Sequence, residues 1–188
     1  MRSWYLQVLI STKRPLLHEF NDADWKAVLQ YQADPAFLRC YPWLHRSPGD
    51  LREFVCRFIE WSQERPRTKF QLAMILQSEK QLIGNCGLRM PSSDSKDGEF
   101  GCELNPRYWR HAFGMEAARA MLQFGFGKLQ LHRIWAECAA ENVAASRLAE
   151  KIGMQKERNL REHKWTMGRW WDTLIYAILD HEWKANTS

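Results

Sequence analysis

The sequence predicts a mixed α/β fold, of the α+β kind, in which a central β-sheet carries helices on both faces. Three strand-like segments follow one another between residues 71 and 104. A helix, a strand and a second helix then succeed one another between residues 114 and 152, and a hairpin closes the chain. Strands in direct succession favour antiparallel pairing, whereas a strand between two helices favours parallel pairing, so we expect a mixed sheet.

The N-terminal third predicts one strand and two helices. The apolar segment "YLQVLI", residues 5–10, is typical of a strand. Residues 22–34 have the composition of a helix capped by Asn21 or Asp22. Residues 47–65 predict a second helix, with Ser47 as its cap and Pro48 in its first turn.

The middle of the chain predicts three strands, at residues 71–76, 81–90 and 99–104. A tight turn separates the first two, and the polar segment "PSSDSKDGE", residues 91–99, is rich in turn formers. These three strands are therefore expected to form an antiparallel meander.

The C-terminal half predicts an amphipathic helix over residues 114–129, in which apolar residues recur at helical spacing. The alternation in "HRIWAECA", residues 132–139, predicts a strand with two different faces. A short helix is expected between a cap at Asn142 and a left-handed stop at Gly153. The final hairpin is expected to pair residues 155–165 with residues 171–179.

Length and composition agree with a single domain over residues 1–188. A hydrophobic fraction of 45% and a charged fraction of 26% are ordinary for a globular protein with a buried core. The apolar runs are too short to span a bilayer, and the N-terminus lacks the features of a signal peptide. We therefore expect a cytoplasmic protein with no membrane association.

Cysteine content and charge exclude further classes. The five cysteines are odd in number and scattered, without a CxxC pair, so neither a disulfide framework nor a metal site is expected. The net charge of +5 is modest and not concentrated in one tract. Dedicated nucleic-acid binding is therefore not the leading interpretation.

One stretch points to a ligand. In "YWRHAFGMEA", residues 108–117, small residues from Ala112 to Gly114 lead into the first C-terminal helix. A helix start has unpaired backbone N–H groups and the positive end of the macrodipole, so an uncrowded turn there suits a phosphate. The alternative is that the small residues only let the helix pack closely on a neighbouring strand.

Five segments, in this order, resemble the GNAT superfamily of N-acetyltransferases: "TKRPLLHEFNDAD", "QLIGNCGL", "ELNPRYWRHAFGMEAARAML", "AENVAASRLAEKIGM" and "GRWWDTLIYAILDHEW". Within that superfamily they look like the branch that acetylates the N-terminal alanine of ribosomal proteins. The resemblance covers nearly the whole chain. It implies a twisted, mostly antiparallel sheet with one splayed parallel pair and a single N-acetyltransferase domain.

The resemblance also implies the substrates. Acetyl-CoA would be the acetyl donor, with no metal ion, and the acceptor would be a primary amine. That amine would belong to a protein N-terminus, such as a ribosomal protein alanine, or to a small molecule, and the amine would attack directly in a ternary complex. A homodimer is compatible with the resemblance.

By resemblance, the backbone of the loop before the long helix surrounds the pyrophosphate of coenzyme A, and this loop comprises Trp109, Arg110, His111, Ala112, Phe113, Gly114 and Met115. Arg110 and Ala112 stand where the family commonly has glycine. Backbone N–H groups around Leu104 and Asn105, where the family's strand splays, would polarise the thioester carbonyl. Asn142 would cap its helix and contact the cofactor, although capping alone is the simpler interpretation.

Acetyl transfer to an amine requires a general base to deprotonate the ammonium group, and a general acid can protonate the leaving thiolate. A carboxylate must deprotonate the attacking ammonium, and the resemblance places Glu103 beside the thioester. The substitutes for this role are Glu99, Glu137 and Glu141. Ser146 is the candidate acid for the leaving thiolate, but Ala145 occupies the position where the branch often has serine. Ala149 likewise stands where other branches carry tyrosine, and protonation of the thiolate by solvent is the alternative.

Other residues admit a role in the cleft. Cys102 is expected on the opposite strand face from Glu103, so an acyl-cysteine is not favoured. Trp43 and Trp165 are candidates to line the acceptor cleft. The competing function is a catalytically silent acyl-CoA-binding or protein-interaction module. A third hypothesis, based on the net charge of +5, is an RNA- or ribosome-binding domain.

Overall fold

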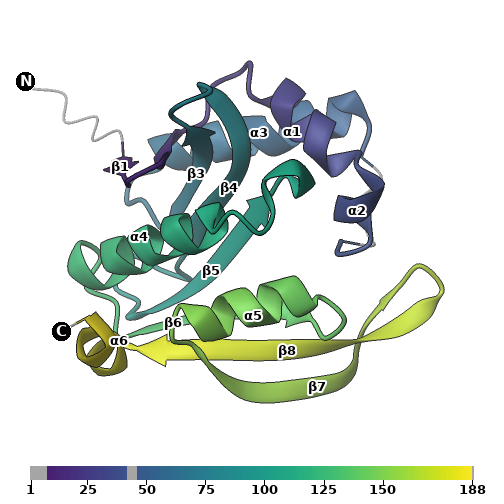
Figure 1. Ribbon diagram of the computed structural model, residues 1–188. Helices are drawn as coiled ribbons and strands as arrows, with labels where there is room; N and C mark the ends of the chain where they lie inside the picture. Colours follow the sequence, from purple (N-terminus) through teal and green to yellow (C-terminus); the bar gives the residue numbers. More distant parts are fainter. Residues whose placement is uncertain (1–7, 42–45, 188) are drawn as a thin grey trace, which may run out of the picture.

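The computed structural model describes residues 8–41 and 46–187 (Figure 1). One eight-stranded sheet has the order β1-β2-β3-β4-β5-β6-β8-β7, and only β5 and β6 pair in parallel. The strands are β1 (Leu9–Ser11), β2 (Pro15–Glu19), β3 (Lys69–Leu76), β4 (Gln81–Arg89), β5 (Asp97–Leu104), β6 (Arg133–Ala139), β7 (Gln155–Thr166) and β8 (Arg169–Leu179). The predicted mixed, mostly antiparallel sheet is thus confirmed.

Helices cover both faces of the sheet (Figure 1). They are α1 (Trp25–Gln32), α2 (Pro35–Leu38), α3 (Pro48–Gln63), α4 (Phe113–Gly127), α5 (Val143–Lys151) and α6 (Asp180–Thr187), and a 3₁₀ turn spans Pro106–Tyr108. The N-terminal helices α1 to α3 pack on one face, and α4 and α5 pack on the other.

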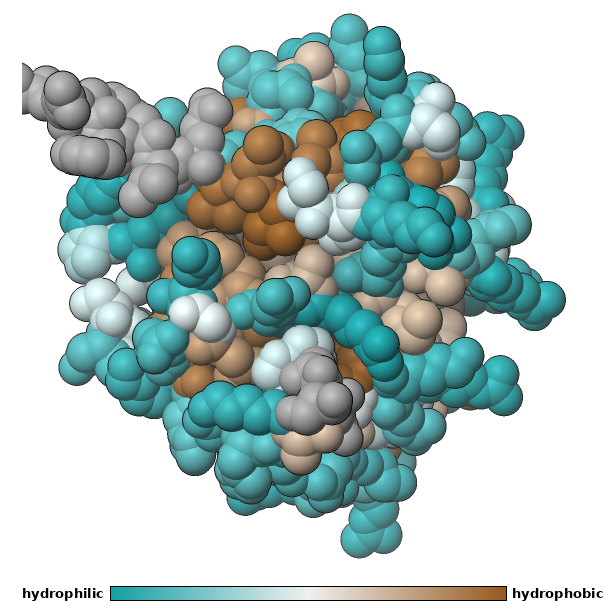
Figure 2. Space-filling view, turned by 60° about the vertical axis from the view of Figure 1, so that its left-hand side comes forward, coloured by the Kyte–Doolittle hydropathy of each residue, from teal (hydrophilic) through white to brown (hydrophobic). Residues whose placement is uncertain are grey.

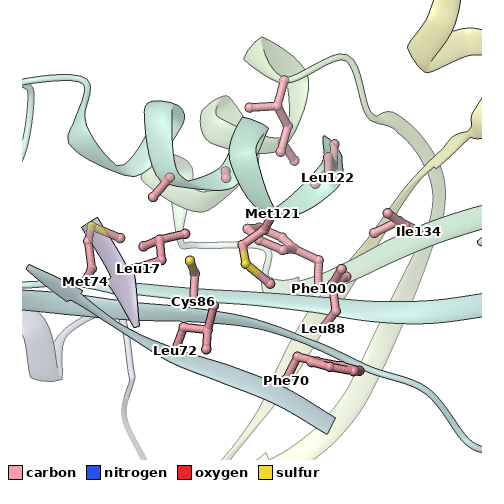
Figure 3. Packing of buried hydrophobic residues seen from close by; sticks show 14 of the residues in the cluster. Leu17, Phe70, Leu72, Met74, Cys86, Leu88, Phe100, Met121, Leu122 and Ile134 are labelled. Atoms are coloured by element: carbon pink, nitrogen blue, oxygen red, sulfur yellow. The ribbon is translucent and has the colours of Figure 1, made fainter. Parts of the chain in front are cut away.

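The strands alternate between these two faces, as their period of two requires. From β3, Phe70, Leu72 and Met74 enter the cluster under α4, where they meet Met121 and Leu122 (Figure 3). The residues between them, including Ala73, face the α1–α3 side. Two hydrophobic layers therefore enclose the sheet.

Local sequence signals account for several helix ends. Ser47 caps α3 in a reciprocal arrangement with Asp50, as predicted from the sequence. α1 begins at Trp25, three residues later than predicted, because Asn21 and Asp24 hydrogen-bond each other in a turn before it. The hairpin turn of β7 and β8 uses left-handed residues, Met167 and Gly168, which suit a tight hairpin.

Further differences from the sequence-based prediction concern the short elements and the starts of two strands. The short helices α2 and α6 were not predicted, and β2 lies in the segment "TKRPLLHEFNDAD", in which only the family resemblance indicates a strand. The predicted strand over residues 5–10 falls partly outside the described residues, and β1 begins at Leu9. β5 starts at Asp97, two residues inside the segment predicted as a loop.

That earlier start of β5 matters because it carries the parallel pairing. Residues Asp97–Glu99 pair with Arg133–Trp135, and the parallel ladder ends there. β5 continues to Leu104 along β4, and β6 continues to Ala139 along β8. The two strands therefore separate, as the family resemblance implied, and the sheet opens between them.

Hydrophilic residues cover most of the face in Figure 2, and hydrophobic residues gather in the upper part of that view. Within residues 8–41 and 46–187, no helix has the length and apolar character needed to cross a membrane. All five cysteines are free thiols.

Candidate active site

The opening between β5 and β6 contains a cleft that passes through the sheet. Gly101 and Cys102 line it from β5, and Ala136 and Cys138 line it from β6. On one side α5 contributes its wall, and on the other side Cys40 and Tyr41, which follow α2, contribute theirs. A substrate can therefore approach the gap from either face of the sheet.

Backbone groups of β5 point into this gap. The Asn105 N–H donates to the Ile83 carbonyl of β4 (2.8 Å), and because alternate residues of a strand bond to the same neighbour, Leu104 points the other way. Its carbonyl accepts the Trp109 indole N–H (2.8 Å), and the Cys102 carbonyl accepts the Tyr41 hydroxyl (3.2 Å). The Leu104 N–H consequently faces the opening.

Asn105 has a different role from the predicted one. Because its N–H bonds to β4, it is not available to a thioester carbonyl, and the prediction that both amides around Leu104 and Asn105 polarise the carbonyl is wrong for Asn105. The buried Asn105 side chain instead accepts the Arg107 N–H (3.0 Å) and shapes the 3₁₀ turn after β5.

Glu103 lies on the α1 side of the sheet, opposite to Leu104. Its Oε2 accepts three hydrogen bonds, from the Tyr31 hydroxyl (3.0 Å), the Gln32 amide (2.9 Å) and the Asn85 amide (2.9 Å). Oε1 accepts none from the described residues, and every buried polar side-chain atom among them has a partner. Oε1 is therefore accessible and has lone pairs free to receive a proton.

The substitute carboxylates are held in ion pairs. Glu99 pairs with Arg89 (2.9 Å), Glu141 with Arg169 (2.8 Å), and Glu137 with Lys164. Glu103 has no such cationic partner among the described residues. No group of three or more potential metal ligands occurs in the described part of the chain.

The loop before α4 adopts the backbone that the family's glycines would favour. Arg110 has a φ of 66° and Ala112 a φ of 63°, both in the left-handed region that side chains disfavour. Ala112 is the N-cap of α4 and offers no side-chain cap, so the first N–H groups of the helix stay unpaired by a cap. Arg110, His111 and Ala112 are exposed, whereas Phe113 and Gly114 are buried and Met115 is half-buried.

The β1–β2 turn braces this loop. Glu116, in the first turn of α4, accepts the Thr12 hydroxyl (2.8 Å) and the Arg14 N–H (2.7 Å). The Arg14 guanidinium bonds to Glu116 (2.9 Å), donates to the His111 carbonyl (3.0 Å) and lies over the Phe113 ring (4.5 Å). These contacts fix the loop in the absence of glycine and offset the charge of Glu116.

Asn142 is confirmed as the cap of α5. It is buried, and its side chain accepts the Ala145 N–H (3.1 Å). Ala145 and Ala149 line the cleft. Ser146 lies one position around the helix, where its hydroxyl donates to the Asn142 carbonyl (3.4 Å) and contacts Cys138 Sγ (3.6 Å). The candidate acid is therefore beside the cleft rather than in its lining.

Thiols and phenols around the cleft are held neutral. Burial, with a smaller contribution from the Glu103 charge, raises the pKa of Cys102 to about 12. Burial likewise raises the pKa values of Cys40 and Cys138. The pKa values of Tyr31 and Tyr41 lie well above their usual range, again through burial first and the Glu103 charge second. These groups are protonated at neutral pH.

Trp165, one of the two tryptophans predicted to line the acceptor cleft, is not among the residues that line it. Trp165 is exposed on β7, where its ring contacts Trp170 (5.3 Å between centroids). Trp43 lies outside the described residues. Sequence reasoning instead missed Tyr31, Gln32 and Asn85. Only Asn85 had a signal, because a polar residue inside the buried strand "QLIGNCGLR" needs a hydrogen-bonding partner.

Comparison with known proteins supports the same class. Residues 14–155 match the family model described as "Acetyltransferase (GNAT) domain". An uncharacterized N-acetyltransferase of Bacillus subtilis, YnaD, is 33% identical over 93% of this chain and 98% of its own length. A crystal structure of a GNAT-family acetyltransferase from Bacillus anthracis is 31% identical, with a TM-score of 0.80 over 93% of this chain and 99% of that one.

A more distant structure shares the fold. RimL, a ribosomal L7/L12 α-N-protein acetyltransferase in complex with coenzyme A, has a TM-score of 0.79 over 92% of this chain and 98% of that one, at 16% identity. The mixed sheet that opens between its two parallel strands is the fold of the solved GNAT-family acetyltransferase from Bacillus anthracis. The chain belongs to the GNAT family of acetyltransferases, and it is an N-acetyltransferase.

Proposed function

We propose that this enzyme transfers the acetyl group of acetyl-CoA to a primary amine by direct attack in a ternary complex, with Glu103 as general base. The environment of Glu103 carries this proposal. Three donors hold Oε2 in place while Oε1 remains accessible beside the opening of the sheet. A positioned carboxylate with a free oxygen is suited to take a proton from an ammonium group or through one water molecule.

Acetyl-CoA would bind on the α4 and α5 side. Its pyrophosphate would meet the first N–H groups of α4 at Phe113, Gly114 and Met115, where the macrodipole favours negative charge. The pantetheine arm would enter the cleft, and the Leu104 N–H would donate to the thioester carbonyl. Leu104 packs toward Gly114, with 3.7 Å between its Cδ2 and an ideal Cβ at that glycine, so the two sites adjoin.

The reaction then proceeds without a covalent enzyme intermediate. Glu103 takes one proton, and the neutral amine attacks the thioester carbonyl carbon. The C–N bond forms and the C–S bond breaks. The nitrogen releases its second proton to solvent to give the amide, and the coenzyme A thiolate leaves and takes a proton from solvent. The high pKa of Cys102 supports this order, because a thiol that stays protonated is a poor nucleophile for an acyl-cysteine pathway.

Charges near the opening favour an acceptor with a single amino group. The Arg46 guanidinium donates to Gln32 Oε1 (3.4 Å), and Gln32 Nε2 donates to Glu103. The Gln32 side chain therefore connects a positive charge to the proposed base. Glu137 at the cleft is neutralised by Lys164. A polyamine carries several positive charges and would meet the Arg46 guanidinium without a free carboxylate at Glu137 to offset it, whereas an N-terminal α-amine or another small monoamine brings a single positive charge.

A thiol-release assay with an acceptor panel tests the proposed function. We expect turnover with alanine- or serine-initiated peptides or with a small monoamine, and a kcat/KM for spermidine at least about tenfold lower, equivalent to about 1.4 kcal/mol of unfavourable charge. Stabilisation by acetyl-CoA without turnover for any amine would instead favour the alternative of a silent acyl-CoA-binding module.

Ser146 provides a second test, because it remains the candidate acid of the family mechanism. We expect Ser146→Ala to change kcat by less than about threefold, since the hydroxyl contacts Asn142 and Cys138 rather than the cleft and a general acid is worth 10²-fold or more. Ala145→Ser, which places a hydroxyl at a lining position, should be at least as active as wild type. A loss of about 10²-fold in Ser146→Ala alone would make Ser146 the acid.

A further inference from the structure

A chain of buried polar side chains crosses three strands and ends at Glu103. Arg89 on β4 donates to Gln71 Oε1 on β3 (2.9 Å), Gln71 donates to Asn85 Oδ1 on β4 (2.7 Å), and Asn85 donates to Glu103 Oε2 on β5 (2.9 Å). Gln71 and Asn85 are only 3% and 2% exposed. Buried amides are costly unless paired, so a connected chain in the interior calls for a reason.

The chemistry of the two ends fixes the direction of the chain. A guanidinium can only donate hydrogen bonds, and an ionised carboxylate can only accept them. Gln71 must therefore turn its oxygen to Arg89 and its nitrogen to Asn85, and Asn85 must turn its oxygen to Gln71 and its nitrogen to Glu103. Every link donates toward Glu103, so each bond polarises the next in the sense that favours negative charge on that carboxylate.

Two glycines leave room for these side chains to lie across the sheet. A Cβ at Gly101 would come within 2.8 Å of the Arg89 guanidinium, and one at Gly87 within 2.5 Å of Gln71 Oε1. A Cβ at Gly87 would also lie 2.3 Å from the Phe70 carbonyl, so backbone packing contributes there. At Gly101, by contrast, the nearest atoms to such a Cβ all belong to the Arg89 guanidinium, so the absence of a side chain there makes room for Arg89.

Other groups also face Glu103. Tyr31 of α1 and Gln32 at its end donate to it, and Asn85 donates to the Tyr31 hydroxyl as well (2.8 Å). Arg46 and Tyr41 interact with its charge from beyond α2, and Cys102 does so from the neighbouring position on β5. None of these groups lies on the Arg89 side of the chain, so a change at Gln71 or Arg89 leaves all of them in place.

We propose that Arg89 and Gln71 are positioning residues that, through Asn85, keep Glu103 ionised and correctly oriented as the base. This inference rests on the proposed function of Glu103. The guanidinium supplies its charge at the half-exposed end of the chain, where it is also paired with Glu99. The hydrogen bonds of Gln71 and Asn85 connect this charge to Glu103 through the interior. Glu103 itself must stay free of a direct ion pair in order to accept a proton.

Gln71→Met and Arg89→Met test the chain. Gln71→Met keeps the side-chain length and removes both hydrogen bonds, and we expect the acid limb of the kcat/KM pH profile to move about one pH unit higher. Arg89→Met should move the acid limb less, but in the same direction. Arg89→Lys keeps the positive charge, so its pH profile should be close to that of wild type. A carboxyl ¹³C titration of Glu103, assigned with Glu103→Gln, should show the same displacement without any need for turnover.

Leu88→Ala is the matched control for destabilisation. Leu88 is fully buried beside Arg89 but points to the opposite face of the sheet, so its truncation should lower Tm without moving either titration. Unchanged titration of Glu103 in folded Gln71→Met and Arg89→Met would overturn the proposal. If Gln71→Met fails to fold, the titration of Glu103 in Arg89→Met and Arg89→Lys tests the proposal without it. An enzyme with no turnover but a displaced titration would refute the proposed function and leave the chain's effect established.

Discussion

Glu103→Gln should lower kcat for acetyl transfer by about 10²- to 10⁴-fold, the range expected for loss of a general base. Glutamine can keep an oxygen where Oε2 accepts from Tyr31, Gln32 and Asn85, so the polar cluster stays paired and the variant should fold. Its outward-facing amide nitrogen cannot accept a proton. Steady-state kinetics with one good acceptor, together with acetyl-CoA affinity by calorimetry, separates the chemical effect from binding, which should be nearly unchanged.

Glu137→Gln is the matched control for this substitution. Glu137 lines the cleft, and it is ion-paired with Lys164 on the exposed hairpin, so its neutralisation should change kcat by less than about threefold. Full activity in Glu103→Gln, or a larger loss in Glu137→Gln than in Glu103→Gln, would show that the base has been assigned to the wrong carboxylate.

Ala112→Asp should weaken acetyl-CoA binding by about 10- to 100-fold, because it places a negative charge where the pyrophosphate is proposed to bind. Ala112 is exposed at the N-cap of α4, so the substitution requires no repacking of the core. A carboxylate there also interacts favourably with the helix macrodipole, and Asp tolerates a positive φ better than Ala. The free variant should therefore be at least as stable as wild type. Calorimetric titration and thermal melts measure both effects.

Two further substitutions separate charge from backbone strain at this position. Ala112→Asn matches the shape of Asp without its charge, and Ala112→Gly removes the strain of about 1–2 kcal/mol that a side chain incurs in the left-handed region. Both should keep acetyl-CoA affinity within about threefold of wild type, because neither adds a charge. Equal affinity in the Asp and Asn variants would exclude Ala112 from the phosphate site.

Sequence reasoning succeeded where the signal is local. Ser47 before α3 and Asn142 before α5 cap their helices as predicted, because capping depends on side chains within three residues of the helix start. The comparison of Arg110 and Ala112 with family glycines correctly located the two left-handed positions of the α4 loop. Helix caps and left-handed positions of this kind depend on only a few residues that are adjacent in the sequence.

It failed where the cause is distant in the chain. Glu103 could be selected, but its partners could not, because Tyr31 and Asn85 lie 72 and 18 residues away and no periodicity connects them. The Asn105 amide was misassigned because its direction depends on which neighbour β5 bonds to at each residue. The start of β5 was misplaced because Asp97 and Gly98 resemble a turn until β6 pairs with them.

The opening of the sheet separates the residues proposed to bind the acetyl donor from the residues around the proposed base. The residues proposed to bind the pyrophosphate lie at the start of α4, whereas the side chains that donate hydrogen bonds to Glu103 come from α1 and β4 on the other face of the sheet. Substitutions around Glu103 can therefore change which amine is acetylated without changing the residues proposed to bind the coenzyme A pyrophosphate. Acceptor specificity and donor affinity are then separable properties of this enzyme.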